Sequence, residues 1–307
     1  MKVIHAANEL GQGSRKVCLA IGVFDGVHLG HQQIIRQTLA DARLHDAVAL
    51  VITFDRHPNS VVAPDRVPPL IYSPSQKLRA IESLGADALL EIHFDRNFSE
   101  KTGETFISEL AQAFGGIHSV CVGADFVFGH KRSGNVDLLK KLGATLNFHV
   151  HGLAAVSLDA QVVSSTRIRD TIRTGDFDAA SQMLGRPYMI CGRVMDGDKL
   201  GRKFGFPTAN LEVARLILPP NGVYAAATHI KGQFYRVALN IGLRPTLASP
   251  QPQLRVEAHL LDFAGDLYGA EVELEIGEKL REERKFGTLE ELRRQIESDV
   301  EKVRSLL

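Results

Sequence analysis

Over the first 185 residues, short apolar runs alternate five times with amphipathic stretches, and this alternation restricts the fold more than any other feature of the sequence. The runs are rich in β-branched or aromatic residues and span residues 17–23, 47–54, 88–94, 119–123 and 146–150. Such runs are typical of parallel strands that helices bury on both faces. The stretches between them, at residues 34–42, 78–84, 106–114 and 136–142, repeat apolar residues at helical spacing. This pattern predicts right-handed crossovers and a doubly wound α/β sheet.

The composition of the sequence changes after residue 185, where glycine and proline become frequent. Short runs with a period of two follow, at residues 222–230, 233–241, 254–263 and 271–276. They predict antiparallel strands of a small sandwich or barrel. Residues 288–307 repeat apolar residues on one face, and Thr288 with Glu291 fits a capping box, so we expect a terminal helix. We therefore predict two domains, residues 1–185 and 186–307.

Composition excludes several classes of partner. The 36 Lys and Arg balance the 36 Asp and Glu, whereas non-specific nucleic-acid binding needs a cationic surplus. No apolar run approaches the roughly 18 residues that cross a bilayer, and the N-terminus lacks the apolar core of a signal peptide. The three cysteines form no CxxC pair, which favours a reducing compartment. We expect a cytoplasmic protein without nucleic-acid or membrane partners, although a local basic pocket for a small anion remains compatible with this balance.

The first apolar run leads directly into GVFDGVHLGH, residues 22–31, and a helical pattern follows. Backbone N–H groups at such a strand–loop–helix junction bind anions, and the helix dipole assists them. Gly26 and Gly30 permit close approach, while His28 and His31 are spaced to face one ligand. The spacing is neither a P-loop nor a dinucleotide fingerprint. A lone histidine is more often packed or at the surface, but two histidines flanking a glycine favour a phosphate site.

Three further segments can contribute to the same site. VVSSTRIR, residues 162–169, places hydroxyls and guanidinium groups at one helix start, which suits a polyphosphate, although serine there is also a common N-cap. TFDRHP, residues 53–58, and VGADFVFG, residues 122–129, follow predicted strands at the edge where α/β proteins bind ligands. Taken alone, Asp125 and the glycines of the last segment are better explained as turn residues.

The second domain contains a glycine loop with cations, at residues 197–205, that leads into FPTAN. Glycine N–H groups with Lys and Arg form an anion nest, and Thr208 and Asn210 supply oxygen donors suited to Mg²⁺ shared with ATP. A tight barrel turn with solvated cations is an equal alternative. Further on, Glu257 lies on the polar face of an alternating run, where carboxylates are usually solvated. A hydroxyl nucleophile would nevertheless need such a base, and NIGLRPT, residues 240–246, either borders a substrate or forms a hairpin turn.

Taken in chain order, these motifs resemble the family of bacterial bifunctional riboflavin kinases/FAD synthetases. HxGH at residues 28–31 and SSTRIR look like the two signatures of the nucleotidyltransferase superfamily. The resemblance runs from end to end and is carried by GVFDGVHLGH, TFDRHP, VGADFVFG, VSSTRIR, LGRPY, GRKFGFPTANL, NIGLRPT, VEAHLLDF, DLYG and LREERKF. The joint presence of HxGH, SSTRIR and GFPTAN makes it specific.

The resemblance implies a Rossmann-like adenylyltransferase domain followed by a six-stranded antiparallel barrel with a C-terminal helix. The second domain would phosphorylate riboflavin to FMN with Mg-ATP, with Glu257 as the base and Thr208 and Asn210 at the metal. The first would adenylylate FMN to FAD with ATP and release pyrophosphate, with His28 and His31 steadying the phosphates. The implied partners are therefore small-molecule substrates and products: ATP, riboflavin, FMN and FAD.

The resemblance also implies a set of contacts, residue by residue. Residues expected at ATP in the adenylyltransferase are Gly22, Phe24, Asp25, Gly26, His28, Gly30, His31, Ser165, Thr166 and Arg167. Those expected at its flavin are His57, Asp125 and Phe128. Residues expected at ATP in the kinase are Gly197, Lys199, Gly201, Lys203, Gly205, Pro207, Thr208 and Asn210. Those expected at its flavin are Asn240, Gly242, Arg244, Pro245, Thr246 and Glu257.

Three positions depart from the family pattern. Arg56 replaces a usual proline, Ala124 replaces an acidic or amide residue, and Leu247 replaces an aromatic residue. The first two bear on flavin contacts at the adenylylation site. One alternative is therefore that only the kinase is active and the first domain is a weak enzyme or a nucleotide- or flavin-binding module. A non-catalytic flavin carrier is a second alternative, and it would not need Glu257 beside a triphosphate loop.

Overall fold

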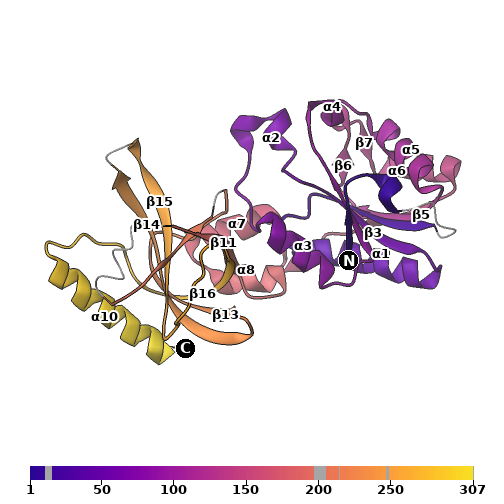
Figure 1. Ribbon diagram of the computed structural model, residues 1–307. Helices are drawn as coiled ribbons and strands as arrows, with labels where there is room; N and C mark the ends of the chain where they lie inside the picture. Colours follow the sequence, from indigo (N-terminus) through magenta and orange to yellow (C-terminus); the bar gives the residue numbers. More distant parts are fainter. Residues whose placement is uncertain (11–15, 197–204, 214, 247–248, 307) are drawn as a thin grey trace. The chain divides into compact units, whose positions relative to one another are not determined.

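The computed structural model describes residues 1–10, 16–196, 205–213, 215–246 and 249–306 (Figure 1). The chain divides into two compact units. The first unit comprises Met1–Pro69 with Pro74–Ser165, and the second comprises Leu70–Ser73 with Thr166–Leu307.

The first unit is built on a parallel sheet of six strands in the order β1-β4-β3-β2-β5-β8. The strands are β1 (Lys2–Ile4), β2 (Val17–Ile21), β3 (Val48–Phe54), β4 (Ala88–Ile92), β5 (Ile117–Gly123) and β8 (His149–Leu153). The doubly wound α/β prediction is confirmed. The strand predicted at 146–150 is shifted, because Asn147 ends the preceding helix in a left-handed conformation (φ 58°). Strand order reverses between β2 and β5, where such sheets bind ligands.

Helices cover both faces of this sheet (Figure 1). α1 (Leu29–Leu44) and α3 (Pro74–Glu82) contribute to the core on one face. α5 (Gly103–Phe114) and α6 (Val136–Leu146) contribute to the core on the other. Shorter elements occupy the connections: η1 (Ala7–Leu10), η2 (Asp25–Val27), α2 (Asn59–Val62), η3 (Pro64–Arg66), α4 (Arg96–Ser99), η4 (His130–Arg132), the β6 (Val127–Phe128)–β7 (Gly134–Asn135) pair and the β9 (Ser157–Leu158)–β10 (Gln161–Val162) pair.

The second unit contains a closed antiparallel barrel in the order β11-β12-β15-β14-β13-β16, as the family resemblance implied. Its strands are β11 (Met189–Met195), β12 (Ala209–Glu212), β13 (Gly222–Ile230), β14 (Gln233–Thr246), β15 (Ser249–Leu260) and β16 (Glu271–Arg281). Two helices precede the barrel, α7 (Ser165–Thr174) and α8 (Phe177–Leu184).

The predicted terminal helix is present as α10 (Leu289–Leu306), which lies along the barrel (Figure 1). At its start the Thr288 hydroxyl accepts a hydrogen bond from the Glu291 N–H (3.2 Å), as in the predicted capping box. Further along, Val303 is fully buried in a small core with Ala225 and Leu261. The helix is therefore part of the folded barrel unit rather than an appendage.

Candidate active sites

The first candidate site begins at the carboxyl end of β2, beside the reversal of strand order. The connection to α1 has three residues with positive φ: Phe24 (52°), Gly26 (78°) and Val27 (42°). Glycine tolerates this conformation, but a β-branched valine is strained in it, and such strain persists only where surrounding contacts hold it. One contact is the 2.9 Å hydrogen bond from the Gln32 side chain to the Val27 carbonyl. A strained, supported loop of this kind is typical of ligand sites.

This loop delivers two histidines to the N-terminus of α1. The rings of His28 and His31 stack with centroids 3.6 Å apart and an interplanar angle of 21°. The Phe24 ring meets His31 edge-on at 5.3 Å. A Cβ at Gly30 would lie 3.3 Å from His28 Cε1, so glycine leaves room for the ring. Two adjacent imidazoles at a helix N-terminus offer N–H donors to an anion.

The structure brings the start of the second motif to this loop. The Ser165 hydroxyl donates a 3.1 Å hydrogen bond to the Asp25 carbonyl, across 140 residues of sequence. Asp25 itself is 5 % exposed. Ser165 is the first residue of α7, and Thr166 and Arg167 follow it in the helix, within the second unit. The serine therefore ties the two motifs together through the backbone of the first.

A cavity of about 420 Å³ opens beside the first turns of α1. Its lining residues are Leu29, Gln33, Arg36, Gln37 and Val156. Leu29 directly follows His28 in the chain. The depression is shallow and open to solvent. Gln33, Arg36 and Gln37 form an ordinary polar helix face, so no sequence pattern marks them.

The predicted flavin residues of the first unit lie on the loops after β3 and β5. His57 accepts a 3.1 Å hydrogen bond from the Asn59 N–H, within its own turn. Asp125 is exposed, and half-buried Phe128 stacks on Phe126 at 5.2 Å. Phe128 also makes an edge contact with Phe106 of α5. The structure does not link His57 to the other two by any described contact.

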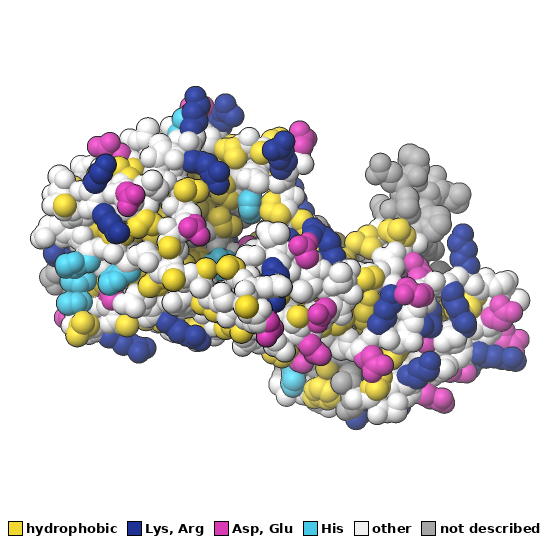
Figure 2. All heavy atoms as spheres, turned by 180° about the vertical axis from the view of Figure 1, so that it is seen from behind, with side chains coloured by type: hydrophobic (Ala, Val, Ile, Leu, Met, Phe, Trp, Pro, Cys, Tyr) yellow, Lys and Arg dark blue, Asp and Glu magenta, His cyan; other side chains and the backbone are white. Residues whose placement is uncertain are grey.

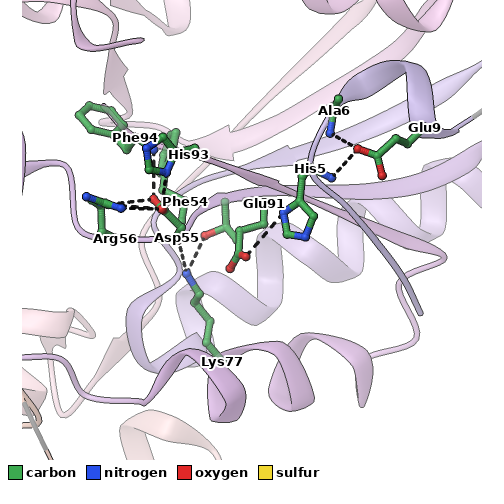
Figure 3. Close-up of polar contacts among 11 residues, drawn as sticks. His5, Ala6, Glu9, Phe54, Asp55, Arg56, Lys77, Glu91, His93 and Phe94 are labelled. Atoms are coloured by element: carbon green, nitrogen blue, oxygen red, sulfur yellow. Dashed lines mark hydrogen bonds and ion pairs between the residues drawn. The ribbon is translucent and has the colours of Figure 1, made fainter. Parts of the chain in front are cut away.

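Asp55, next to the unusual Arg56, is a hub of hydrogen bonds (Figure 3). Its carboxylate accepts from the Phe94 N–H (3.0 Å) and from Arg56 Nη2 (3.1 Å), and it lies 2.7 Å from His93 Nδ1. Burial alone would raise the pKa of Asp55, but these hydrogen bonds outweigh it and lower the pKa. Arg56 therefore contacts its neighbouring carboxylate, a partner that the usual proline would not provide.

The second candidate site lies on the outer face of the barrel. In the β12–β15 and β14–β15 pairings, Glu257 stands opposite Asn210 on one side and Asn240 on the other. Residues directly opposite in antiparallel strands share a face, so the carboxylate lies between two amides. Val256 and Ala258, its neighbours along β15, are buried inside the barrel. This places Glu257, whose side chain is 30 % exposed, on the polar face that the sequence predicted.

A histidine that sequence reasoning missed fixes the segment before β12. His259 Nδ1 donates a 2.8 Å hydrogen bond to the Pro207 carbonyl, and its ring packs edge-on against Phe206 at 5.6 Å. Burial lowers the pKa of His259. The period of two along β15, which puts His259 on the same face as Glu257, is the signal that could have found it. Thr208, beside Pro207, is exposed.

The other predicted kinase residues are described to different extents. The Glu283 carboxylate packs where a Cβ at Gly242 would be, and it accepts from the Leu243 N–H at 3.3 Å. Four predicted ATP residues, together with Leu247, lie outside the described residues: Gly197, Lys199, Gly201 and Lys203. For two predicted flavin residues, Arg244 and Thr246, the structure gives only backbone pairing in β14, and Pro245 lies in the same strand at a shift in register between them. Gly205 takes a positive φ (86°) at the start of the described segment.

Family models account for nearly the whole chain. The model for FAD synthetase matches residues 11–167, and the model for riboflavin kinase matches residues 184–307. Among the described residues, no helix has the length and apolarity that crossing a bilayer requires. In the same part of the chain, no three His, Cys, Asp or Glu side chains are grouped to hold a metal ion.

Similar proteins were found in several bacteria. The bifunctional riboflavin kinase/FMN adenylyltransferase of Haemophilus influenzae is 37% identical over 97% of this chain and 96% of its own. The protein of the same description from Pseudomonas fluorescens is 36% identical over 100% and 98%. A crystal structure described as a macrolide-efflux protein from Streptococcus pneumoniae has a TM-score of 0.83 and 28% identity, and it covers 100% of both chains. That likeness shows a shared architecture; efflux is a description of the other protein.

Proposed function

This chain belongs to the family of bifunctional riboflavin kinases/FMN adenylyltransferases, and on that premise we propose how its two sites perform the two reactions. The enzyme phosphorylates riboflavin to FMN and adenylylates FMN to FAD, with ATP as co-substrate in both steps. The assignment of individual residues to these steps is our proposal.

For adenylyl transfer, an FMN phosphate oxygen attacks the α-phosphorus of ATP, a P–O bond forms, and the bond to pyrophosphate breaks. His28 and His31 hold the phosphates and the charge that develops on the leaving group. Their stacked arrangement at the N-terminus of α1, fixed by the strained loop, is the observation that carries this assignment.

Other residues take their proposed roles at this site from the family pattern. Gly22, Phe24, Asp25, Gly26 and Gly30 shape the phosphate loop, and Ser165, Thr166 and Arg167 contribute hydroxyl and guanidinium donors. His57, Asp125 and Phe128 contact the flavin. Phe128 is suited to the apolar ring system because its half-buried ring already stacks on Phe126.

For phosphorylation, the riboflavin 5′-hydroxyl attacks the γ-phosphorus of ATP in line, and Glu257 accepts the hydroxyl proton. Support comes from its position between Asn210 and Asn240 on the outer face of the barrel. Arg255 Nη1 lies 3.8 Å from Glu257 Oε1, beyond hydrogen-bonding distance.

We propose that Thr208 and Asn210 hold Mg²⁺ with the ATP phosphates, because a hydroxyl and an amide oxygen are the hard donors that this ion prefers. The ion, when bound, neutralises phosphate charge. His259 fixes the Pro207 carbonyl and so orients the segment that carries Thr208. The remaining ATP and flavin residues of the kinase are those of the family pattern, as given above.

The domain boundary after residue 185 and a cytoplasmic location are also proposals. Gly185 ends α8 in a left-handed conformation (φ 70°), β11 of the barrel begins at Met189, and the riboflavin kinase model starts at residue 184, which together support this boundary. The compact units themselves divide earlier, between Ser165 and Thr166, so α7 and α8 pack with the barrel unit. The three cysteines are buried as thiols, which suits a reducing compartment.

The assignments are tested by following riboflavin, FMN and FAD chromatographically in the presence of ATP and Mg²⁺. Glu257→Ala is expected to abolish FMN formation and leave FMN-to-FAD conversion largely intact, whereas His28→Ala is expected to do the reverse. Loss of both activities in either variant would contradict two independent sites. Retention of both would contradict the assigned residues, and FMN as the only product of the unmodified chain would favour a kinase with a non-catalytic first domain.

A further inference from the structure

Lys77 has no role in the family pattern described above, yet it lies at the edge of the sheet that carries the first site. It comes from the first turn of α3, and its ammonium donates a 2.7 Å hydrogen bond to the Phe54 carbonyl and a 3.3 Å hydrogen bond to Thr53 Oγ1. Figure 3 shows the side chain reaching from the helix to the end of β3. Thr53 is fully buried, and its hydroxyl donates in turn to the Val23 carbonyl at 3.0 Å. The chain of contacts therefore links the carboxyl ends of β3 and β2.

The surroundings of Lys77 are acidic and partly shielded from water. Burial lowers the pKa of Lys77, and the carboxylates of Glu91, Asp25 and Asp55 offset part of that effect. Each carboxylate comes from a different segment: Asp25 from η2, Asp55 from the end of β3, and Glu91 from β4. The Lys77 ammonium thus places a positive charge among three segments that meet at this edge.

The loop that follows Val23 is the strained one. It holds Phe24, Gly26 and Val27 at positive φ before it reaches His28, so its shape depends on contacts from outside the loop. Lys77 is connected to this loop in two ways. It donates a hydrogen bond to Thr53, which donates in turn to the Val23 carbonyl, and its ammonium interacts electrostatically with the Asp25 carboxylate. In addition, α3 packs directly against η2.

We propose that Lys77 is a positioning residue for adenylyl transfer, whose ammonium clamps the ends of β2 and β3 and thereby holds the loop that carries His28. The proposal rests on the assigned role of the His28–His31 pair. Lys77 acts through Thr53 and the loop backbone rather than on the substrate. A misplacement of reacting groups by about 1 Å costs on the order of a hundredfold in rate.

The test uses steady-state kinetics of the full chain with FMN and ATP. Lys77→Met, which keeps the length of the side chain and removes the ammonium, is expected to lower kcat for FAD formation about ten- to a hundredfold. KM for ATP and for FMN is expected to stay within about threefold, because a positioning residue contributes little uniform binding. Lys77→Arg is expected to retain more activity than Lys77→Met. Riboflavin phosphorylation by the same samples is expected to be unchanged.

Thr53→Val provides a readout that a general loss of stability would not give. It removes the hydroxyl that connects Lys77 to Val23, at nearly constant shape, and is expected to lower kcat in the same direction. If the two residues act through one chain of contacts, the double variant will be no slower than about the Lys77→Met single variant. If the reductions in kcat of the two single variants multiply in the double variant, the two residues act independently and the clamp is refuted. If Lys77→Met does not fold, Lys77→Gln, which keeps a donor without the charge, takes its place with the same expectations.

Lys140→Met, which removes an exposed lysine of the same unit, is the matched control and is expected to behave like the unmodified enzyme. A Lys77→Met enzyme with kcat within about threefold of normal would overturn the proposal, as would a loss confined to KM for ATP, which would indicate direct phosphate binding. The His28→Ala variant separates this proposal from the site assignment. Full FAD formation by His28→Ala would refute the site, whereas normal kinetics of Lys77→Met alone would refute only the clamp.

Discussion

Replacing Asp299 with asparagine tests how α10 is held on the barrel. Asp299 is 3 % exposed, and its carboxylate accepts three hydrogen bonds from the Arg281 guanidinium at 2.8–3.1 Å. Gln295 of the same helix donates a fourth at 2.8 Å. Arg281 closes β16, so this pair joins the last barrel strand to the terminal helix. Asparagine keeps the shape and one oxygen but removes the charge that Arg281 pairs with.

The magnitude follows from the burial of the pair. Removing one partner of a buried ion pair costs about 3–5 kcal/mol, because the other charge is left without compensation. Arg281 keeps some contact with water, since its side chain is 18% exposed, so we expect the lower end of that range, about 3 kcal/mol. With a urea dependence of about 2 kcal/mol per molar, the midpoint of unfolding of the second unit falls by about 1.5 M.

The assay must report on each unit separately, and the chain has no Trp to serve as a local probe. Samples equilibrated in urea are therefore given a short protease pulse, and mass spectrometry measures which peptides of each unit survive. The second unit is expected to unfold at lower urea in Asp299→Asn, while the first keeps its midpoint. Asp262→Asn, which breaks the exposed pair with Arg304 of the same helix, is the control and should leave both midpoints unchanged.

A midpoint shift below about 0.5 M, or an equal shift in the Asp262→Asn control, would refute the reasoning. The combined Arg281→Met and Asp299→Leu variant sharpens the test. Replacing both partners with apolar side chains leaves no uncompensated charge, so this variant is expected to recover most of the lost stability. If it is as unstable as Asp299→Asn, packing rather than the ion pair holds the helix.

Three further predictions use the same enzyme. Glu257→Gln, which keeps the shape of the proposed base, is expected to lower kcat of riboflavin phosphorylation about 10²–10⁴-fold and leave FAD formation from FMN unchanged. If the variant and the unmodified enzyme phosphorylate riboflavin with the same kcat, Glu257 is not the base. In Gly30→Ala, the added Cβ would lie 3.3 Å from the His28 ring and is expected to disturb it. Steady-state rates should therefore show slower FAD formation and unchanged riboflavin phosphorylation. Burial and neighbouring cations lower the pKa of His118, so the folded state resists protonation of this ring. The first unit should therefore lose stability as pH falls below 6.5. The urea midpoints of the first unit at about pH 7 and about pH 5.5 should differ less in His118→Gln than in the unmodified enzyme.

Burial, together with the packing of several histidines on one surface of the first unit that Figure 2 shows, lowers the pKa of His118. The ring of His118, from β5, lies 3.9 Å from that of His45 at the end of α1 and 5.5 Å from that of His149 at the start of β8. Lys16 adds a further positive charge, and Asp41 opposes these effects. The cluster lies at the amino edge of the sheet, away from the candidate site.

Periodicity predicted most of the elements, and the exceptions have local causes. The strand β1 has only three residues, too few to show a pattern. The sequence pattern also did not predict β11 and β12, because glycines interrupt the alternation around them. β14 extends past its predicted end at residue 241, and β15 begins before its predicted start at residue 254. Leu243 and Leu254 face each other in register there, and they continue the alternation of the buried residues although they are exposed.

Short glycine and histidine motifs located the candidate sites, but the residues that support those motifs lie far away in the sequence. Lys77 contacts a carbonyl 23 residues earlier, and His259 contacts one 52 residues earlier. Each belongs to an element whose own pattern explains it as an ordinary helix or strand position. Contacts of this kind arise only when separate elements meet, so a pattern within one element carries no sign of them.

For Glu257, the sequence predicted the residue and its face of the strand but not its neighbours in space. Its place on the polar face of β15 follows from the period of two, and the sequence predicted it. Which groups flank it depends on the pairing of β12 and β14 with β15, because a slip of one residue in either pairing would replace an amide with a side chain from the barrel interior. The closed barrel fixes both registers at once. The surroundings of Glu257 are therefore a property of the fold, whereas the residue itself and its face of the strand could be predicted from the sequence.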